Sequence, residues 1–360
     1  MISQTPKTTL NDVLIPLLSF TLLFSQQVHA YTLIDTFNSS NFFSEFDFFS
    51  QPDPTNGFVD YVNISTANHN KLAGYSQGGI YLGVDHHNLT NGTTTGGRKS
   101  TRLTSKTAYT TGLFIADIAH MPSGKTRAED SCGLWPAYWM FGPNWPNSGE
   151  IDIIEGVNTQ KANSITLHTA NGCSMSNNTG SISTTKMVSS DCEGNGGCGQ
   201  QTQALETYGI GFNSGGGGYY IMEWTESFIS VWFVPRSNAE TVTKLLNTID
   251  TSNSSSISIT SSLGGQQPLA TFNGGNDCSI SNHFANHNIV FDTTFCGDWA
   301  GKTWKSDSTC SALADTCEEW VGQNPEKFVS AYWLINEIKV YQKKGGSNNK
   351  TKREAVRFRG

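Results

Sequence analysis

The run Gly149-Glu150-Ile151-Asp152-Ile153-Ile154-Glu155-Gly156 sets three acids among isoleucines, and it restricts the fold more than any other stretch of the chain. β-Branched residues favour strands, and side chains alternate between the faces of a strand, so Glu150 and Asp152 share one face. Glu155 comes five residues after Glu150 and would face away in a regular strand. One extra residue in a β-bulge would bring it back. We therefore predict a bulged strand that presents all three acids on one face.

Three carboxylates on one face of a sheet repel one another, and a purely structural role does not explain them. Chemistry does, because a retaining glycosidase uses one carboxylate as nucleophile and a second, protonated carboxyl group as general acid. A third acid between them helps to keep one group ionised and the other protonated. The alternative is an edge strand with solvated acids. We favour a catalytic site because Trp139 and Trp145 lead into the run, and a solvated face would not need them.

The spacing Glu-x-Asp-x-x-Glu, preceded by Gly133-Leu134-Trp135-Pro136-Ala137-Tyr138-Trp139, resembles the signature of glycoside hydrolase family 16. The resemblance extends from about Tyr31 to Gln342 and is strongest to the fungal endo-β-1,3(4)-glucanases, the laminarinase-like members. Members with the shorter Glu-x-Asp-x-Glu spacing include lichenases and cell-wall transglycosylases, so the extra residue favours the laminarinase-like group. The resemblance implies a jelly roll with substrate lying across the concave face of one sheet.

The resemblance also implies roles for the residues of the site. Glu150 is expected to be the nucleophile, Asp152 to assist it, and Glu155 to act as general acid and then as general base. His168, in Ser164-Ile165-Thr166-Leu167-His168, matches a histidine on the strand after the catalytic strand in laminarinase-like members. We predict that it contacts substrate or supports the acids, the alternative being a satisfied core or surface histidine.

A glucan cleft usually combines flat aromatic side chains with hydrogen-bonding groups, because sugar rings present apolar C–H faces. Trp145, just before the acids, is predicted to be such a platform at the cleavage point. Trp135 and Trp139 share a face of any strand there, and they either bind substrate or pack in the core. Of the two tryptophans in the run YYIMEWTESFISVWF, Trp224 is predicted to reach the cleft. Trp299 is predicted to form an outer subsite or to be an exposed loop residue.

The rest of the chain is typical of an all-β protein. Short runs rich in aromatic and β-branched residues alternate with clusters of Gly, Asn and Ser. Helical periodicity is limited to Ala239–Leu246, with a short turn expected at Cys317–Val321. No linker divides the runs, so we predict one jelly-roll β-sandwich of two antiparallel sheets with a concave substrate cleft over residues 31–342. Examples of the runs are Gly79–Val84, Gly112–Ile118 and Tyr219–Trp224.

Residues 1–30 have the pattern of a signal peptide. Lys7 precedes the apolar run Val13–Phe24, and Val28-His29-Ala30 ends as a signal-peptidase site does. The run is short for a membrane anchor and contains Pro16, so we expect a secreted chain that begins at Tyr31. Seven N-x-S/T sequons agree with passage through a glycosylating pathway. They lie at Asn38, Asn63, Asn88, Asn91, Asn177, Asn253 and Asn349.

All eight cysteines follow residue 30, and their even number in a secreted chain predicts disulfides, whose connectivity stays open. Zinc is the alternative, but the spacings show no paired Cys-x-x-Cys or Cys/His pattern. Calcium occurs in many members of the family that the chain resembles, but no loop rich in Asp and Asn indicates a dedicated site. We therefore predict no cofactor and no metal. The cysteines are Cys132, Cys173, Cys192, Cys198, Cys278, Cys296, Cys310 and Cys317.

Charge is distributed unevenly along the chain. Residues 343–360 hold seven Lys or Arg and one Glu, and the formal charge of the whole chain is −7, so the remainder is strongly acidic. An acidic body repels nucleic acid and anionic membranes and suits a neutral polysaccharide. We predict a monomer that binds β-glucan, with a basic, disordered tail over residues 343–360. Arg102 is expected to make a buried ion pair within the body.

These features predict a secreted, endo-acting, retaining glycosidase that hydrolyses internal linkages of β-1,3- and mixed β-1,3/1,4-glucans. Two alternatives stay open. A cell-wall glucan transglycosylase would use the same covalent intermediate with a sugar as acceptor. A non-catalytic, lectin-like glucan-binding protein would use similar aromatic platforms, but it predicts the loss of at least one acid. This chain retains all three.

Overall fold

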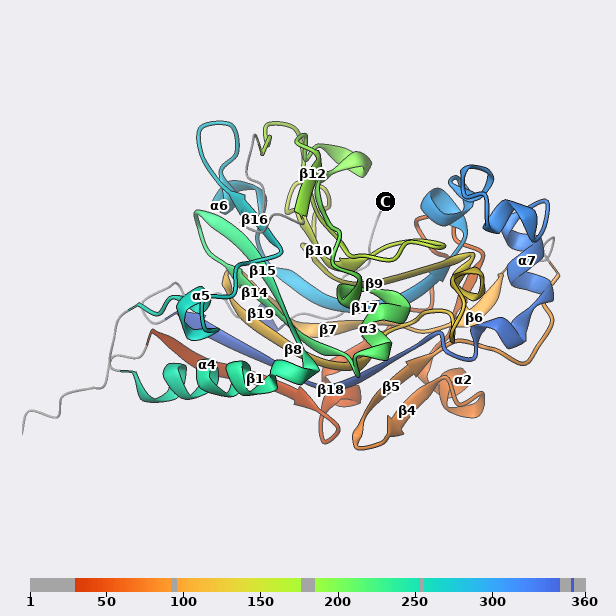
Figure 1. Ribbon diagram of the computed structural model, residues 1–360, viewed down its shortest axis with the longest axis horizontal. Helices are drawn as coiled ribbons and strands as arrows, with labels where there is room; N and C mark the ends of the chain where they lie inside the picture. Colours follow the sequence, from red (N-terminus) through yellow and green to blue (C-terminus); the bar gives the residue numbers. More distant parts are fainter. Residues whose placement is uncertain (1–29, 92–95, 176–184, 253–255, 344–350, 353–360) are drawn as a thin grey trace, which may run out of the picture.

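The computed structural model describes residues 30–91, 96–175, 185–252, 256–343 and 351–352. Two large antiparallel sheets stack face to face, with short helices and loops at their ends (Figure 1). This arrangement confirms the predicted all-β sandwich.

The first sheet, here called the covered sheet, has eight strands in the order β16-β15-β14-β8-β18-β5-β4, with β1 paired to β18. One of its faces packs on the other sheet, and the opposite face is covered in part by α4 (Ala239–Thr251), which lies along it in Figure 1. Its strands are β1 (Tyr31–Asn38), β4 (Ala73–Ser76), β5 (Gly79–Gly83), β8 (Gly112–His120), β14 (Gly218–Trp224), β15 (Phe228–Pro235), β16 (Ala270–Asn273) and β18 (Tyr332–Lys343).

The second sheet, here called the cleft sheet, has nine strands in the order β12-β13-β11-β10-β9-β17-β7-β19, with β2 paired to β7. Its strands are β2 (Phe46–Phe48), β7 (Arg102–Tyr109), β9 (Leu134–Phe141), β10 (Glu150–Glu155), β11 (Ser164–His168), β12 (Thr185–Ser189), β13 (Cys198–Thr202), β17 (His287–Phe295) and β19 (Thr351–Lys352). A separate parallel pair joins β3 (Val59–Tyr61) to β6 (Arg98–Ser100). The other α-helices are α1 (Phe42–Glu45), α2 (Ile64–His69), α3 (Gly209–Ser214), α5 (Ile259–Ser262), α6 (Ile280–His283) and α7 (Cys317–Gln323).

The main hydrophobic core lies between the two sheets, where each strand turns alternate residues inward. Phe114 and Trp333 of the covered sheet meet Met140, Ile151 and Phe291 of the cleft sheet, and all five side chains are fully buried. Burial of so many large apolar side chains is the main stabilising contribution to a sandwich of this size. It also leaves the other face of the cleft sheet available for polar residues.

The sequence-based helices are confirmed, with one extension. The helix predicted over Ala239–Leu246 continues to Thr251 as α4, because Val242, Leu245 and Ile249 keep a spacing of three and four that turns them all toward the sheet. The turn predicted at Cys317–Val321 is the first part of α7.

All eight cysteines are paired, which confirms the disulfide prediction. Two of the bonds, Cys132–Cys310 and Cys296–Cys317, hold residues 296–331 against the beginning of β9 and the end of β17. We call residues 296–331 the disulfide lobe. A third bond, Cys173–Cys278, spans 105 positions of sequence, and the fourth, Cys192–Cys198, closes a loop between β12 and β13.

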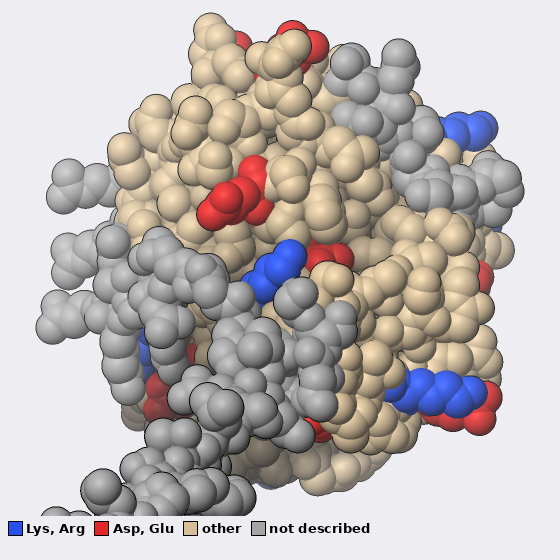
Figure 2. Space-filling model, turned by 90° about the vertical axis from the view of Figure 1, so that its left-hand side faces the viewer, with Lys and Arg blue, Asp and Glu red and all other residues tan. Residues whose placement is uncertain are grey.

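Parts of the two predicted terminal segments are described. β18 extends to Lys343, and within the predicted tail the two residues of β19 pair with β7. The rest of the tail, residues 1–29 of the signal peptide predicted over 1–30 and the sequons at Asn177, Asn253 and Asn349 lie outside the described residues. No helix in the described ranges has both the length and the apolar character needed to cross a bilayer. The face in Figure 2 shows scattered charges of both signs rather than a continuous basic patch.

Candidate active site

β10 carries the three acids in the middle of the cleft sheet. Glu150 and Glu155 are five residues apart in β10, but their partners in β9, Phe141 and Ala137, are four residues apart. The register shifts just after Asp152, and both isoleucines at the shift are fully buried. An even separation on the neighbouring strand places the two glutamates on the same face of the sheet. The predicted β-bulge is therefore confirmed.

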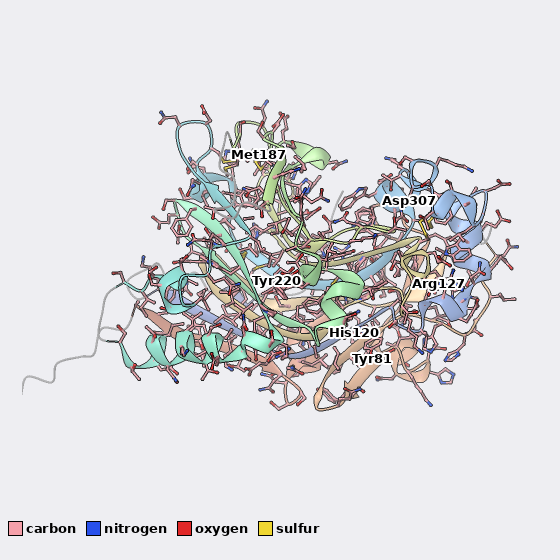
Figure 3. The ribbon with its side chains drawn as sticks, in the orientation of Figure 1. Tyr81, His120, Arg127, Met187, Tyr220 and Asp307 are labelled. Carbon is pink, nitrogen blue, oxygen red and sulfur yellow. A yellow bond between two sulfur atoms is a disulfide. The ribbon has the colours of Figure 1, made fainter. Side chains whose placement is uncertain are left out.

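A cleft of about 580 Å³ lies over the acids and crosses the strands of the cleft sheet. Figure 3 labels Met187 of β12 and Asp307 of the disulfide lobe, which lie on opposite sides of this face. The cleft is lined by the three acids and by five of the six other predicted site residues, namely Trp135, Trp139, Trp145, His168 and Trp299. The sequence did not indicate several further lining residues, among them Asp53, Asp292, Asp298 and Lys302 at one end and Thr166, Val188, Asn195 and Gly199 at the other.

Trp224 does not line the cleft, so the prediction for this residue is wrong. β14 belongs to the covered sheet, and Trp224 points into the core between the sheets, where it is 1% exposed and packs against His287 with ring centroids 4.7 Å apart. Trp232 packs with the residues under α4 on the opposite face. Both faces of this strand pair are buried, so alternation along the strand does not reveal which sheet it joins.

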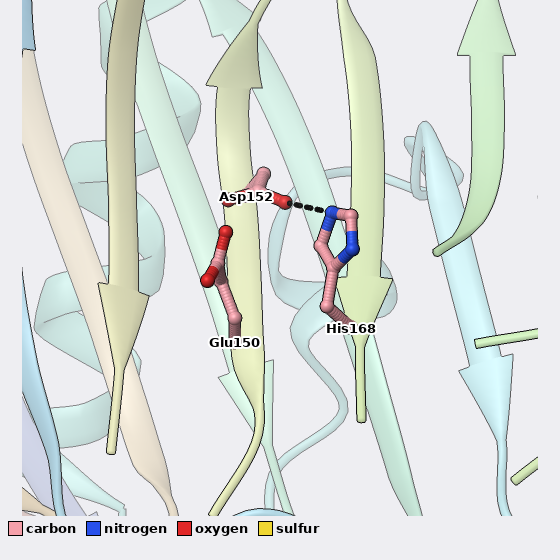
Figure 4. Close-up of side chains that lie close together, drawn as sticks. All are labelled: Glu150, Asp152 and His168. Atoms are coloured by element: carbon pink, nitrogen blue, oxygen red, sulfur yellow. Dashed lines mark ion pairs between the residues drawn. The ribbon is translucent and has the colours of Figure 1, made fainter. Parts of the chain in front are cut away.

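His168 lies on β11 directly across from Glu150. Its Nε2 is 3.2 Å from Asp152 Oδ2 (Figure 4), and its Nδ1 is 2.8 Å from the carbonyl oxygen of Gly194. Burial alone would lower the pKa of His168, but the hydrogen bond and charge of Asp152 and the charge of Glu150 raise it to about 10. These neighbours favour the charged imidazolium form. A role for His168 in substrate contact or in support of the acids stays a prediction.

The surroundings of the two glutamates raise their pKa values. Burial is the largest cause for both, and the charge of Asp152 adds to it. The pKa of Glu150 rises to about 8, opposed by the cation of His168 and a hydrogen bond with Trp145. The pKa of Glu155 rises well above its ordinary range. The cation of His168 faces Glu150 across the two strands, so it opposes the rise of the Glu150 pKa more directly than that of Glu155.

Each glutamate also has its own tryptophan. Trp135 Nε1 donates a hydrogen bond to Glu155 Oε1 at 2.7 Å, and the indole of Trp145 acts on Glu150 by opposing the rise of its pKa. Both indole rings line the cleft. Trp135 therefore orients the carboxyl group of Glu155 directly, and both tryptophans present flat surfaces to the cleft.

Arg102 makes the buried ion pair that the sequence predicted. Its Nε lies 3.9 Å from Asp292 Oδ2, and its guanidinium lies over the ring of Trp139, 4.9 Å from the centroid. Trp139 Nε1 donates to the same carboxylate oxygen at 3.2 Å. Burial raises the pKa of Asp292 to about 7, although the charge of Arg102 opposes the rise. Trp139 is thus a packed residue, 8% exposed, that also lines the cleft.

Trp299 reaches the cleft from the disulfide lobe. It lies in a π-helical turn, Gly297–Gly301, and its ring meets the ring of Trp135 edge to face with centroids 5.8 Å apart. The preceding Asp298 accepts a hydrogen bond from Asn56 at 2.9 Å and pairs with Lys302 at 2.9 Å. The lobe therefore adds an aromatic wall that continues outward from the Glu155 end of β10.

One cluster of side chains in the site has the spacing of metal ligands. Within the described ranges, Glu150, Asp152 and His168 are the one group of three whose ligand atoms lie within 4.8 Å of one another. Calcium takes roughly six to eight oxygen ligands, and an imidazole is not among them. His168 Nε2 lies 3.2 Å from Asp152 Oδ2, and the surroundings favour the imidazolium form, which has no lone pair for a transition metal. These three residues fit an ion pair among acids better than a metal centre.

Comparison with known proteins agrees with this geometry. A model of the XgeA-like catalytic domain of glycoside hydrolase family 16 matches residues 46–341. A probable endo-1,3(4)-β-glucanase of Aspergillus fumigatus is 42% identical over 334 residues, which cover 91% of this chain and 48% of the relative. An endo-1,3(4)-β-glucanase of Arthroderma benhamiae is also 42% identical, over 87% of this chain and 65% of its own length. The chain thus spans about half the length of the first relative.

Two solved structures have the same arrangement of sheets. Laminarinase 16A from Phanerochaete chrysosporium, solved with 6-O-glucosyl-laminaritriose in its donor and acceptor sites, is 38% identical with a TM-score of 0.74, covering 87% of this chain and 99% of that one. An elongating family 16 β-1,3-glucosyltransferase is 39% identical with a TM-score of 0.71, covering 87% of this chain and all of the other.

The two stacked sheets form a jelly-roll fold. The three acids on one face of the cleft sheet form a site of the kind found in glycoside hydrolases. With the family model matched over most of its length, the chain belongs to glycoside hydrolase family 16. The resemblance predicted from the acid spacing is thereby confirmed.

Proposed function

We propose that this chain is the catalytic domain of a secreted, endo-acting, retaining β-glucanase that hydrolyses internal linkages of β-1,3- and mixed β-1,3/1,4-glucans. The observation that carries the proposal is the bulged strand β10, which places Glu150, Asp152 and Glu155 together in a cleft lined with tryptophans. Four disulfides support secretion, because such bonds persist in oxidising compartments. The named activities of the fungal relatives support the substrate class.

In the proposed mechanism, Glu150 attacks the anomeric carbon while Glu155 gives its proton to the departing glycosidic oxygen. The resulting ester between Glu150 and the sugar is then hydrolysed by a water molecule, which returns a proton to Glu155. Asp152 and the cation of His168 keep charge near Glu150, and Trp135 orients the carboxyl group of Glu155. The difference between the two carboxyl environments supports two different roles.

Internal cleavage is supported by the extent of the cleft on both sides of the acids. Lining residues continue from β9 to Asp298 and Lys302 in one direction and to Val188 and Asn195 in the other. A polymer can therefore extend past the acids both ways. The test is to follow viscosity and reducing ends together in a β-1,3-glucan solution, where viscosity should fall first. Release of glucose alone from chain ends would contradict an endo action.

The linkage and the stereochemistry have their own tests. Oligosaccharides released from laminarin and from lichenan should show cleavage of both glucans. The first-formed product should keep the β configuration when its anomeric proton is followed by NMR. An α product would exclude the covalent intermediate.

Transglycosylation is a second candidate, favoured by the likeness to the elongating β-1,3-glucosyltransferase. It would use the same ester of Glu150, with a sugar hydroxyl in place of water. Incubation with a single laminari-oligosaccharide distinguishes the two reactions. Products longer than the starting material would show transfer, and only shorter products would show hydrolysis.

A further inference from the structure

The loop between Cys192 and Cys198 lies directly against the end of β11. The disulfide closes the loop after six positions, and both cysteines are fully buried. Thr169, the residue after β11, donates its N–H to the Cys192 carbonyl at 2.7 Å and accepts the N–H of Gly194 at 2.9 Å. On the other side of the loop, Cys198 pairs with Leu167 in the register of β11 and β13. The loop is thus attached on both sides to the strand that carries His168.

This loop makes two contacts with the ring of His168. The Gly194 carbonyl oxygen lies 2.8 Å from Nδ1. Gly197, with a φ of +60°, lies so close that a Cβ there would be 2.6 Å from Cε1 of the ring. A positive φ and this close approach both require glycine. The imidazole is therefore held on one edge by a carbonyl group and on another by backbone.

The contact with Gly194 determines which nitrogens of His168 carry hydrogen. A carbonyl oxygen only accepts, so Nδ1 must be protonated. The other nitrogen, Nε2, lies 3.2 Å from Asp152 Oδ2, where a lone pair would repel the carboxylate. With Nδ1 already protonated, the ring meets both partners as the imidazolium ion. Without the loop, the ring could turn or take the other neutral tautomer.

Few other charges act on this ring. Glu150 and Asp152 face it from β10, and Glu155 of the same strand also interacts with its charge. In the loop and β13, which pack against it, Glu193 is the one titratable side chain, and it is exposed. The loop thus acts on the ring through its backbone contacts and not through a charged side chain.

We infer that the loop closed by Cys192–Cys198 is a positioning element of the active site, which holds His168 as a cation beside Asp152 and Glu150. This inference rests on the proposed glucanase function for its kinetic consequence. Gly194 and Gly197 act through His168 and not on substrate. The loop keeps a positive charge where the nucleophile has to ionise.

The test is the pH dependence of kcat/KM for Cys192→Ser/Cys198→Ser. A less well-held His168 loses its proton more easily, and the loss of an opposite charge raises the pKa of Glu150. The acid limb should therefore move to higher pH by about one unit or more. Glu193→Ala, in the same loop, is the matched control and should leave the limb in place. An unmoved limb in a folded double variant would overturn the inference.

Two further variants protect the test against simple misfolding. Gly197→Ala keeps the disulfide but pushes a methyl group into the ring, so it should move the acid limb in the same direction. In a His168→Ala background, neither loop change should move the limb further. An additional shift in that background would show that the loop acts by another route and would overturn the inference.

A spectroscopic readout separates this inference from the proposed function. Long-range ¹H–¹⁵N spectra of the histidine rings should show His168 protonated on both nitrogens at pH 7 in the unmodified chain, and less so in Cys192→Ser/Cys198→Ser. Identical His168 signals in the two proteins would overturn the inference whatever their activity. Absence of glucan cleavage by the unmodified chain would instead overturn the proposed function.

Discussion

Both ends of β10 carry a glutamate, but the residues around the two glutamates differ. Glu150 has the cation of His168 as its partner in β11, whereas Glu155 has Ser164. Each end also has one tryptophan: Trp135 donates a hydrogen bond to Glu155, and the indole of Trp145 opposes the rise of the Glu150 pKa. Burial raises the pKa of both acids, so burial does not distinguish them. One position of strand pairing, histidine at one end and serine at the other, therefore gives the two glutamates different electrostatic surroundings.

The largest expected effect comes from removing each acid. Glu150→Ala and Glu155→Ala should each lower the hydrolysis of unactivated glucan by about 10³-fold or more, because each removes one of the two reacting carboxyl groups. Azide should rescue them differently. In Glu150→Ala it should occupy the vacated α face and give an α-glycosyl azide. In Glu155→Ala, with an activated leaving group, it should attack the glycosyl-enzyme and give a β-glycosyl azide.

The anomeric configuration of each azide can be read by NMR. A β azide from the first variant together with an α azide from the second would reverse the roles at the two ends of β10. Rescue requires a folded variant, so thermal unfolding of both proteins serves as the control.

The next effect is a shift of one limb of the pH profile. A hydrogen bond to a carboxylate favours its ionised form, so losing the indole raises the pKa. Trp145→Phe should raise the pKa of Glu150 and move the acid limb of kcat/KM to higher pH. Trp135→Phe should raise the pKa of Glu155 and move the basic limb to higher pH. Each shift should be about half to one unit, since a hydrogen bond contributes about 1 kcal/mol.

Trp139→Phe is the matched control for both variants. Its indole donates to Asp292 and not to either glutamate, so neither limb should move, whatever happens to the rate. If Trp145→Phe moved the basic limb, the comparison between the two ends would be wrong.

A smaller effect concerns stability. Glu150 has a folded-state pKa of about 8 against an ordinary value of 4.5, so the native state holds the proton more tightly than the unfolded chain. The resulting stability is fully present below pH 4.5 and is lost as the pH rises toward 8. Glu150→Gln avoids this loss, and its Tm should exceed that of the unmodified chain by about a few degrees at pH 8.

The same measurement compares the two ends. The pKa of Glu155 is also raised, so Glu155→Gln should stabilise the chain over the same rising part of the pH range. At pH 4 neither substitution should raise the Tm. An equal gain at pH 4 and pH 8 would show that packing, and not ionisation, is responsible.

The smallest effect is expected in the outer cleft. Trp299→Ala removes the ring that packs on Trp135, and KM for long oligosaccharides should rise by about 2- to 10-fold with little change in kcat. Val188→Ala, at the opposite end and 62% exposed, should change KM less. A fall in kcat with unchanged KM would show that Trp299 acts on Glu155 through Trp135 and not on the bound chain.

Much of the arrangement of β10 could be predicted, because the alternation of side chains along a strand depends only on neighbouring residues. Alternation placed Glu150 and Asp152 together, and the odd separation of Glu155 required a bulge, which the structure contains. Trp224 could not be placed in this way. Its strand is apolar on both faces, and only the pairing with β8 and β15 shows that it belongs to the covered sheet.

The remaining features depend on contacts between distant parts of the chain. Arg102 was expected to be paired, but its partner Asp292 lies 190 positions away and is brought close by the pairing of β7 with β17. The connectivity of the cysteines likewise depends on the folded loops. Gly194 contacts His168 through its backbone carbonyl group, so no side chain in the sequence could predict this contact.

The bulge in β10 has a consequence for reading related chains. The proposed chemistry needs both glutamates on the same face of the sheet. Their partners in β9 are four residues apart, an even number that meets this requirement. The number of residues in β10 itself is free to differ by one, provided that the surplus isoleucine finds room in the core. A strand with one residue fewer between its two glutamates would place them on the same face without a bulge.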